Sequence, residues 1–145
     1  MFAAVLDSCV LWPSLQRDFL LSLAVEGIYR PLWSERILEE VHYTEEAKFV
    51  RRGAAPDDAR KAADHLITQM REAFDDSCVS GWKPLEGTYG LPDPDDEHVV
   101  AAAHMGGAGA IVTHNLRDFP PDRLPGELDV QTPAVFAAHT VGVDP

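Results

Sequence analysis

Acidic side chains recur at four places along the sequence where they could act together. Asp7 directly follows a short apolar run, and Glu40 lies within an amphipathic segment. Asp96 opens an alanine-rich segment, and Asp118 follows a later apolar run. Carboxylates brought close together repel one another unless a proton or a cation lies between them. Hard oxygen ligands suit Mg²⁺ or Mn²⁺, which can activate water and neutralise charge on a phosphate.

Strands and helices are expected to alternate and to position these acids. The predicted strands are 2–6, 28–33, 78–82, 110–112 and 128–130. Helical spacing predicts helices over 18–26, 56–74, 97–105 and 133–139, and another between the N-cap Ser34 and a break at 51–57. The proline-rich segment 83–96 is expected to be a loop. This alternation predicts an α/β fold with a mostly parallel sheet, in which ligands bind at the carboxyl ends of the strands.

Length and composition restrict the class of protein. The 145 residues contain 24 acidic and 12 basic side chains, a net charge of −12, which argues against a polybasic nucleic-acid coat. No linker or repeat divides the chain, so one domain over 1–145 is expected. Apolar runs fall short of the roughly 20 residues of a membrane helix. Two cysteines are too few for a disulfide framework, which favours a reducing, cytoplasmic setting.

Each acid taken alone also has an ordinary structural explanation. An aspartate at the start of a helix, such as Asp93, Asp95 or Asp96, is common as an N-cap. Glu39 and Glu40 could form a solvated helix face. Asp7 is the exception, because a charge at the end of a buried strand needs a compensating partner.

Four stretches of the chain resemble the PIN-domain ribonucleases, and among them the bacterial VapC-like toxin branch. These stretches are VLDSCVLWP (5–13), WSERILEEV (33–41), LPDPDDEHVVAAAH (91–104) and AIVTHNLRDFP (110–120). They occur in the order and at the spacing of the family, and the resemblance covers residues 2 to about 120. It implies a PIN-like three-layer α/β/α sandwich with a central, mostly parallel sheet. It also implies a divalent-metal-dependent endoribonuclease that leaves a 5′-phosphate and a 3′-hydroxyl.

The same resemblance implies three acidic site residues. The first acid of the family falls on Asp7, and the helix glutamate falls on Glu40, with Glu39 as its neighbour. The third acid falls on Asp96. Asp7, Asp96 and Glu40 are therefore expected to hold Mg²⁺ or Mn²⁺ directly or through waters.

The fourth position of the family pattern varies between Asp and Asn, and Asn115 occupies it here. Asp118, three residues further on, is expected to supply the missing charge directly or through water. Thr113 is expected to hydrogen-bond near Asp7. Since Asn115 is a neutral ligand that weakens a second metal site, one metal is as consistent with the sequence as two.

RNA approaching an acidic pocket needs basic residues along its path. The candidates are Arg17, Arg36, Arg51, Arg52 and Arg117. Two of these assignments have alternatives. Arg36 lies four residues before Glu40 and could simply pair with it, and the 51–52 pair could be a solvated helix end.

The resemblance further implies partners for the chain. A VapC-like toxin is masked by a small antitoxin protein and commonly forms a homodimer. Two other functions stay open. A PIN-fold module that binds RNA or protein without cleavage is favoured by Asn115. A nuclease of RNA processing that is not a toxin would use the same residues.

Overall fold

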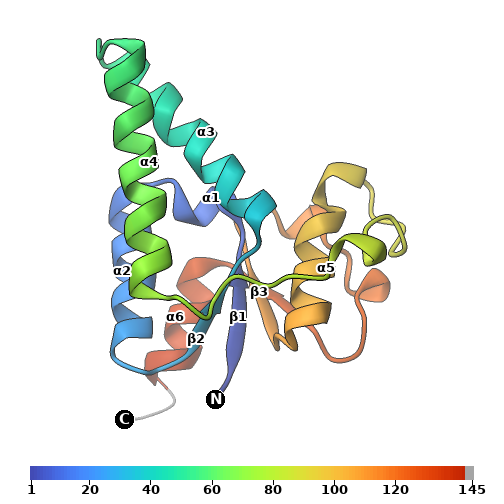
Figure 1. Ribbon diagram of the computed structural model, residues 1–145. Helices are drawn as coiled ribbons and strands as arrows, with labels where there is room; N and C mark the ends of the chain where they lie inside the picture. Colours follow the sequence, from blue (N-terminus) through green and yellow to red (C-terminus); the bar gives the residue numbers. More distant parts are fainter. Residues whose placement is uncertain (143–145) are drawn as a thin grey trace.

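The computed structural model describes residues 1–142, which fold around a four-stranded sheet (Figure 1). The strands are β1 (Ala3–Leu6), β2 (Arg30–Leu32), β3 (Ala110–Val112) and β4 (Asp129–Gln131). Their order is β2-β1-β3-β4, and every neighbouring pair is parallel. All four carboxyl ends therefore lie along one edge of the sheet. The expected α/β class is confirmed, with a sheet that is wholly rather than mostly parallel.

Strand β1 is central because its side chains are apolar on both faces. Val5 lies opposite Leu32 of β2 and Ile111 of β3. From Ala4 to Leu6 no side chain has exposed surface. A strand covered on both faces reads as a continuous apolar run, which is the pattern of this segment.

Within residues 1–142, six α-helices cover the sheet or extend from it. They are α1 (Ser8–Leu11), α2 (Ser14–Val25), α3 (Glu35–Arg51), α4 (Pro56–Ala73), α5 (Glu97–Gly106) and α6 (Pro133–Gly142). Figure 1 shows α5 on one side of the strands, with α2 and α6 on the other. Ala101, Ala102 and Ala103 of α5 are fully buried, and their small side chains let the helix approach β1 and β3 closely.

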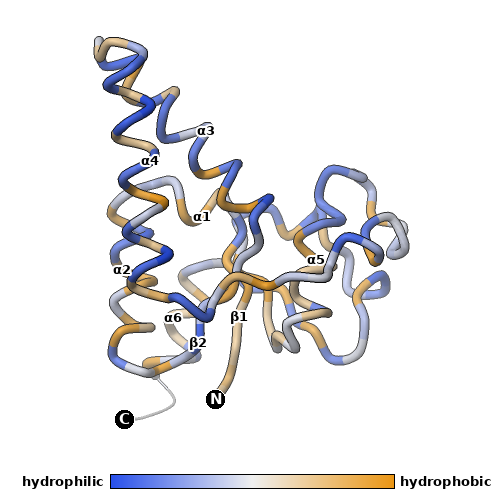
Figure 2. Tube along the Cα trace, viewed as in Figure 1, coloured by the Kyte–Doolittle hydropathy of each residue, from blue (hydrophilic) through white to orange (hydrophobic). Residues whose placement is uncertain are grey.

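Helices α3 and α4 pack together as a hairpin that projects away from the sheet (Figure 1). The Ser34 hydroxyl caps α3 by accepting a hydrogen bond from the Ile37 amide at 3.2 Å. Pro56 begins α4 at a position where no amide donor is needed. The projecting end of the hairpin is mostly hydrophilic in Figure 2. Only the first part of α3 therefore belongs to the edge of the sheet where the strands end.

Three features of the chain differ from the sequence predictions. The strand predicted over 78–82 is wrong, since only a single bridge joins Cys78 to Trp33. The segment pairs for one residue and then turns at Gly81, which has a φ of 76°. A short helix, α1, follows β1 directly, and α2 begins at Ser14, four residues earlier than expected. The predicted loop 83–96 contains two 3-10 turns, η1 (Lys83–Leu85) and η2 (Pro94–Asp96).

Two further properties describe residues 1–142. None of their helices combines the length and the apolar character needed to cross a membrane. Both cysteines, Cys9 and Cys78, are free thiols.

Candidate active site

The carboxyl edge of the sheet carries a cleft of about 410 Å³ that is lined mainly by polar residues. Its lining residues are Asp7, Ser8, Cys9, Arg36, Glu39, Glu40, Tyr43, Thr44, Asp95, Asp96 and Asn115. They come from the end of β1, from α1 and α3, from the turn before α5 and from the segment after β3. The topology thus gathers acids that are far apart in the sequence.

Asp7 occupies the junction between β1 and α1 and is 5% exposed. Its carboxylate accepts hydrogen bonds from the Ser8 amide at 2.8 Å and from the Thr113 hydroxyl at 2.9 Å. Burial raises the pKa of Asp7, and the charge of Glu40 adds to this, although the bonds from Thr113 and Ser8 oppose it. Thr113 thus lies where the sequence placed it, as a hydrogen-bond partner of the first aspartate.

Asp96 lies at the end of η2, immediately before α5. Burial, followed by the charges of Asp118 and Asp7, raises the pKa of Asp96 to about 6. Its Oδ2 atom is buried and has no hydrogen-bond partner within residues 1–142. Asp96 therefore bears both the cost of burial and the repulsion of neighbouring carboxylates, which the charge of His98 opposes only in part.

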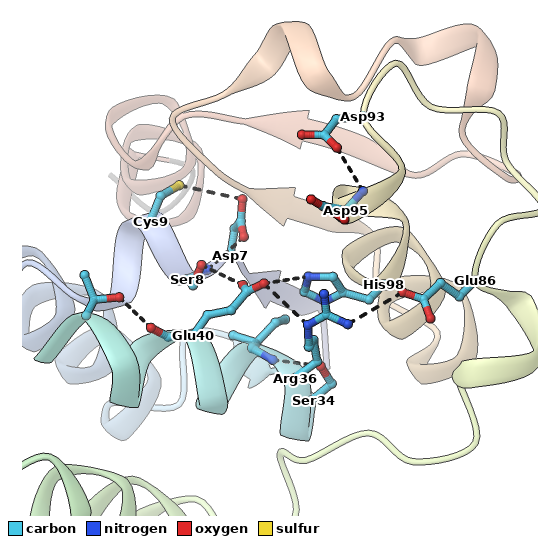
Figure 3. Close-up of polar contacts among 12 residues, drawn as sticks. Asp7, Ser8, Cys9, Ser34, Arg36, Glu40, Glu86, Asp93, Asp95 and His98 are labelled. Atoms are coloured by element: carbon cyan, nitrogen blue, oxygen red, sulfur yellow. Dashed lines mark hydrogen bonds and ion pairs between the residues drawn. The ribbon is translucent and has the colours of Figure 1, made fainter. Parts of the chain in front are cut away.

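Glu40 points from α3 between Ser8 on one side and His98 on the other (Figure 3). The Ser8 hydroxyl donates to Oε1 at 2.9 Å, and His98 Nε2 lies 3.0 Å from Oε2. The Arg36 guanidinium is 3.8 Å from the same Oε2. Burial opposes the charged form of Glu40, but His98, Ser8 and Arg36 together outweigh burial and lower the pKa.

The residues fit a hard cation at the two aspartates. Asp7 and Asp96 both have raised pKa values, and Asp96 has a buried oxygen without a partner. A cation between them would satisfy that oxygen and relieve the repulsion. Within the described part of the chain, no three His, Cys, Asp or Glu side chains are arranged to hold a metal ion. Each carboxylate oxygen of Glu40 accepts one hydrogen bond, from Ser8 or from His98, and keeps a second lone pair that is free for a cation or a water.

Asn115 and Asp118 lie beside this pair. Asn115 is exposed and lines the cleft, and its backbone N–H donates a hydrogen bond to the Thr113 hydroxyl at 3.1 Å. Asp118 is half-buried in the 3-10 turn η3 (Leu116–Asp118) and acts on Asp96 through its charge. Glu39 also lines the cleft and is exposed, whereas its neighbour Glu40 belongs to the hydrogen-bonded network.

Arg17 is not available to RNA in this structure, contrary to its predicted role. It is 7% exposed, and its Nη1 donates to the carbonyl oxygens of Leu11 at 3.0 Å and Trp12 at 3.3 Å. The guanidinium thereby satisfies carbonyls at the end of α1, which have no partners within so short a helix. Its function is to join α1 to α2.

The other predicted arginines lie at different distances from the cleft. Arg36 lines it but forms ion pairs with Glu40 and Glu86. Arg51 and Arg52 are exposed at the far end of α3, roughly 16 Å from Glu40 at the helical rise per residue. Arg117 is exposed in η3. The structure therefore does not gather these side chains into one basic surface.

The sequence interpretation did not identify Ser8 and Tyr43, which line the cleft, or His98, which lies behind it. Ser8 directly follows Asp7, and only the structure shows that its hydroxyl reaches Glu40. Tyr43 is 74% exposed and lies one turn beyond Glu39 on α3. Its spacing of four residues from Glu39 was a helical pattern by which the sequence could have identified it. His98 lies behind Glu40 and is 58 residues away in sequence.

Cys9 contacts the site but is not a nucleophile. Its thiol lies 3.6 Å from Asp7 Oδ2 and 3.4 Å from the Thr113 hydroxyl. Burial, and then the charge of Asp7, raises the pKa of Cys9 to about 11. The thiol is therefore protonated at neutral pH, and the reactive thiolate is scarce.

A family model described as PIN domain matches residues 3–117. The chain therefore belongs to the PIN-domain family, which is a family of nucleases that typically use divalent metals. The match covers β1 to β3 and every lining residue of the cleft. No curated protein and no solved structure matches the chain.

The raised pKa of Asp96 predicts a pH-dependent stability in metal-free protein. Between pH 3.8, the ordinary pKa of an aspartate, and about pH 6, Asp96 is protonated in the folded chain but ionised in the unfolded chain. The stabilising contribution is therefore complete below pH 3.8 and is lost as pH rises through 6. The difference between a pKa of 3.8 and one of about 6 corresponds to roughly 3 kcal/mol. Because Asp96 is partly exposed, screening by water reduces this contribution to about 1 kcal/mol.

Asp96→Asn is accordingly expected to be about 1 kcal/mol more stable than wild type at pH 7.5 and equally stable near pH 4. Urea unfolding in EDTA across this pH range measures the difference. Asp75→Asn removes an exposed carboxylate and is the control for net charge. If the free energy of unfolding depended on pH equally in wild type and in Asp96→Asn, the expected destabilisation by ionised Asp96 would be contradicted.

Proposed function

We propose that this protein is a divalent-metal-dependent endoribonuclease that hydrolyses RNA phosphodiester bonds. One observation carries the proposal: Asp7 and Asp96 line one cleft, and each has a raised pKa caused by burial and by neighbouring carboxylates. Two carboxylates that resist ionisation together in an open cleft are suited to bind Mg²⁺ or Mn²⁺. Membership of a nuclease family supports a nucleic acid as the substrate of this cleft.

We assign the following roles in metal binding and hydrolysis to residues of the cleft. Asp7 and Asp96 would hold the cation, with Asn115 and Asp118 beside them. A divalent cation held there would supply an activated water and neutralise charge on the phosphate. Thr113 and the Ser8 amide hold the carboxylate of Asp7 in one orientation. Glu40 contributes a third negative charge at the wall of the cleft.

The test of this function is cleavage of a mixed RNA pool by purified protein. Cleavage is expected with Mn²⁺ or Mg²⁺ and is expected to stop with EDTA. Binding of Mn²⁺, measured by calorimetry, is a separate readout that does not depend on finding the right RNA. Absence of both cleavage and metal binding would refute the proposal.

Tyr43 is expected to contact an unpaired base of the substrate. It is 74% exposed, lines the cleft, and also borders a neighbouring groove that contains Arg51. Stacking of a base on an aromatic ring contributes about 1–3 kcal/mol. Tyr43→Ala should therefore raise KM for single-stranded RNA about tenfold with little change in kcat, and Tyr43→Phe should keep the wild-type KM.

Phe19→Ala serves as the control for this prediction. Phe19 is a half-exposed aromatic residue on α2 that does not line the cleft. Steady-state cleavage of a short oligonucleotide gives KM and kcat for each variant. A KM of Tyr43→Ala no higher than that of Phe19→Ala would exclude the stacking role.

We further propose that the chain acts as a single PIN domain and as the toxin of a type II toxin–antitoxin pair, in the VapC-like branch. The resemblance of its four sequence stretches supports this, and the net charge of −12 suits a small basic antitoxin. A homodimer is the expected assembly. Growth arrest on expression, relieved by the product of an adjacent small gene, tests the toxin role against RNA processing.

A binding module without cleavage is the second candidate. It is favoured by Asn115 and by Glu40, whose two oxygens already accept hydrogen bonds. Such a module would bind RNA equally well in EDTA and in Mn²⁺. Metal-dependent cleavage that is lost in Asp7→Asn separates the two candidates.

A further inference from the structure

The Glu40 carboxylate is held from two elements besides its own helix. Ser8 of α1 donates to Oε1, and His98 of α5 contacts Oε2 at 3.0 Å. Arg36, one turn earlier on α3, is 3.8 Å from that same Oε2. Two cationic or donor groups therefore compete for one oxygen, and His98 holds the shorter contact.

His98 is a polar side chain that is buried among its neighbours, which is an unfavourable position for a residue whose only role is packing. The side chain is 1% exposed, and its ring lies 6.2 Å from the ring of Trp82, centroid to centroid. Its second ring nitrogen, Nδ1, is buried and lacks a hydrogen-bond partner in the described residues. A buried polar atom without a partner costs stability. The contact with Glu40 is the polar interaction that offsets this cost.

The position of His98 in the chain connects it to the other acids. It follows Asp96 by two residues at the start of α5. The same helical turn thus places Asp96 at the cleft and directs an imidazole at Glu40. For Nε2 to donate to the carboxylate, the neutral ring must carry its proton on Nε2.

We propose that His98 is a positioning residue of the site, and this inference rests on the proposed function. Its bond to Oε2 keeps the Glu40 carboxylate directed at the cleft and prevents it from closing onto Arg36. Partners of this kind typically change metal affinity 10- to 100-fold when they are removed, because they fix the orientation of the groups around the ion. His98 itself touches neither cation nor substrate.

Two substitutions separate the hydrogen bond from packing. His98→Leu fills the space without a donor, whereas His98→Gln places an amide N–H within reach of Glu40. We expect His98→Leu to bind Mn²⁺ about tenfold more weakly than wild type in calorimetry, and His98→Gln to recover most of the affinity. His104→Leu is the matched control, because His104 is an exposed histidine of the same helix that does not line the cleft.

A metal-free readout tests the contact itself. In the ¹⁵N spectrum of wild type, the His98 ring is expected to carry a slowly exchanging proton on Nε2. Glu40→Ala should remove that protection without changing the spectrum of the His104 ring. A ring protonated on Nδ1 alone would overturn the inference.

The outcomes distinguish this inference from the proposed function. Wild type that fails to bind Mn²⁺ and fails to cleave RNA contradicts the proposed function. Wild type that binds Mn²⁺ with the same affinity as a folded His98→Leu overturns the positioning role. Equal loss of affinity in folded His98→Leu and His98→Gln also overturns it, because a donor then makes no difference.

Discussion

Asp7→Asn and Asp96→Asn are each expected to reduce metal-dependent RNA cleavage about 10³-fold or more. Each substitution keeps the size of the side chain but removes the negative charge that a cation needs. Both aspartates lie in the cleft at the carboxyl edge of the sheet. Single-turnover cleavage of one RNA substrate in Mn²⁺ measures the rate directly.

Metal binding and stability show whether such a loss is specific. Both variants should fold, and Asp96→Asn should gain stability without metal, because neutralisation relieves its interaction with Asp118 and Asp7. Their affinity for Mn²⁺ should fall together with the cleavage rate. Glu39→Gln removes an exposed carboxylate at the rim of the same cleft and provides the comparison. Full activity in either Asn variant would show that the cleavage has another origin.

Glu97→Ala is expected to lower the free energy of unfolding by about 3 kcal/mol. Glu97 is 3% exposed, and its carboxylate accepts three backbone amide protons from Gly87 at 2.8 Å, Tyr89 at 3.1 Å and Leu91 at 2.8 Å. These bonds fasten the loop before η2 to the start of α5. Truncation leaves three backbone N–H groups without an acceptor, and each can form a new hydrogen bond only if water reaches it.

Urea denaturation measures this loss, and a decrease in Tm of about 10 °C should accompany it. Glu97→Gln retains one acceptor oxygen but presents an amide group to a backbone donor, so an intermediate loss is expected. Glu127→Ala removes an exposed glutamate and should change the stability by less than about 0.5 kcal/mol. If Glu97→Ala were as stable as Glu127→Ala, the three hydrogen bonds to Glu97 would make no net contribution to the free energy of unfolding.

The parts of the site that the sequence could predict depend on single, local patterns. Asp7 ends a continuous apolar run, so a buried strand with a charge at its carboxyl end was predictable. Thr113 follows another such run, and parallel pairing of β1 with β3 brings it within 2.9 Å of Asp7. Asp96 precedes an alanine-rich helix, which is a recognisable start signal.

The remaining features depend on contacts between distant segments. Arg17 has the charge of an RNA-binding residue, but the short helix α1 offers it two free carbonyls that the sequence did not predict. The 78–82 segment has the apolar composition of a strand, yet it forms only one bridge before it turns. The bond between His98 and Glu40 depends on the relative placement of α5 and α3, which no local pattern encodes.

The parallel pairing of β1 with β3 has a consequence for synthesis of the protein on the ribosome. Asp7 is translated before Thr113, which holds it through a hydrogen bond and follows 106 residues later. Pairings at such sequence separation form late, because the intervening chain must first be closed into a loop. A nascent chain that stops before β3 therefore exposes Asp7 without its hydrogen-bond partner. The assembled cleft exists in the cell only after β3 and Thr113 have been translated.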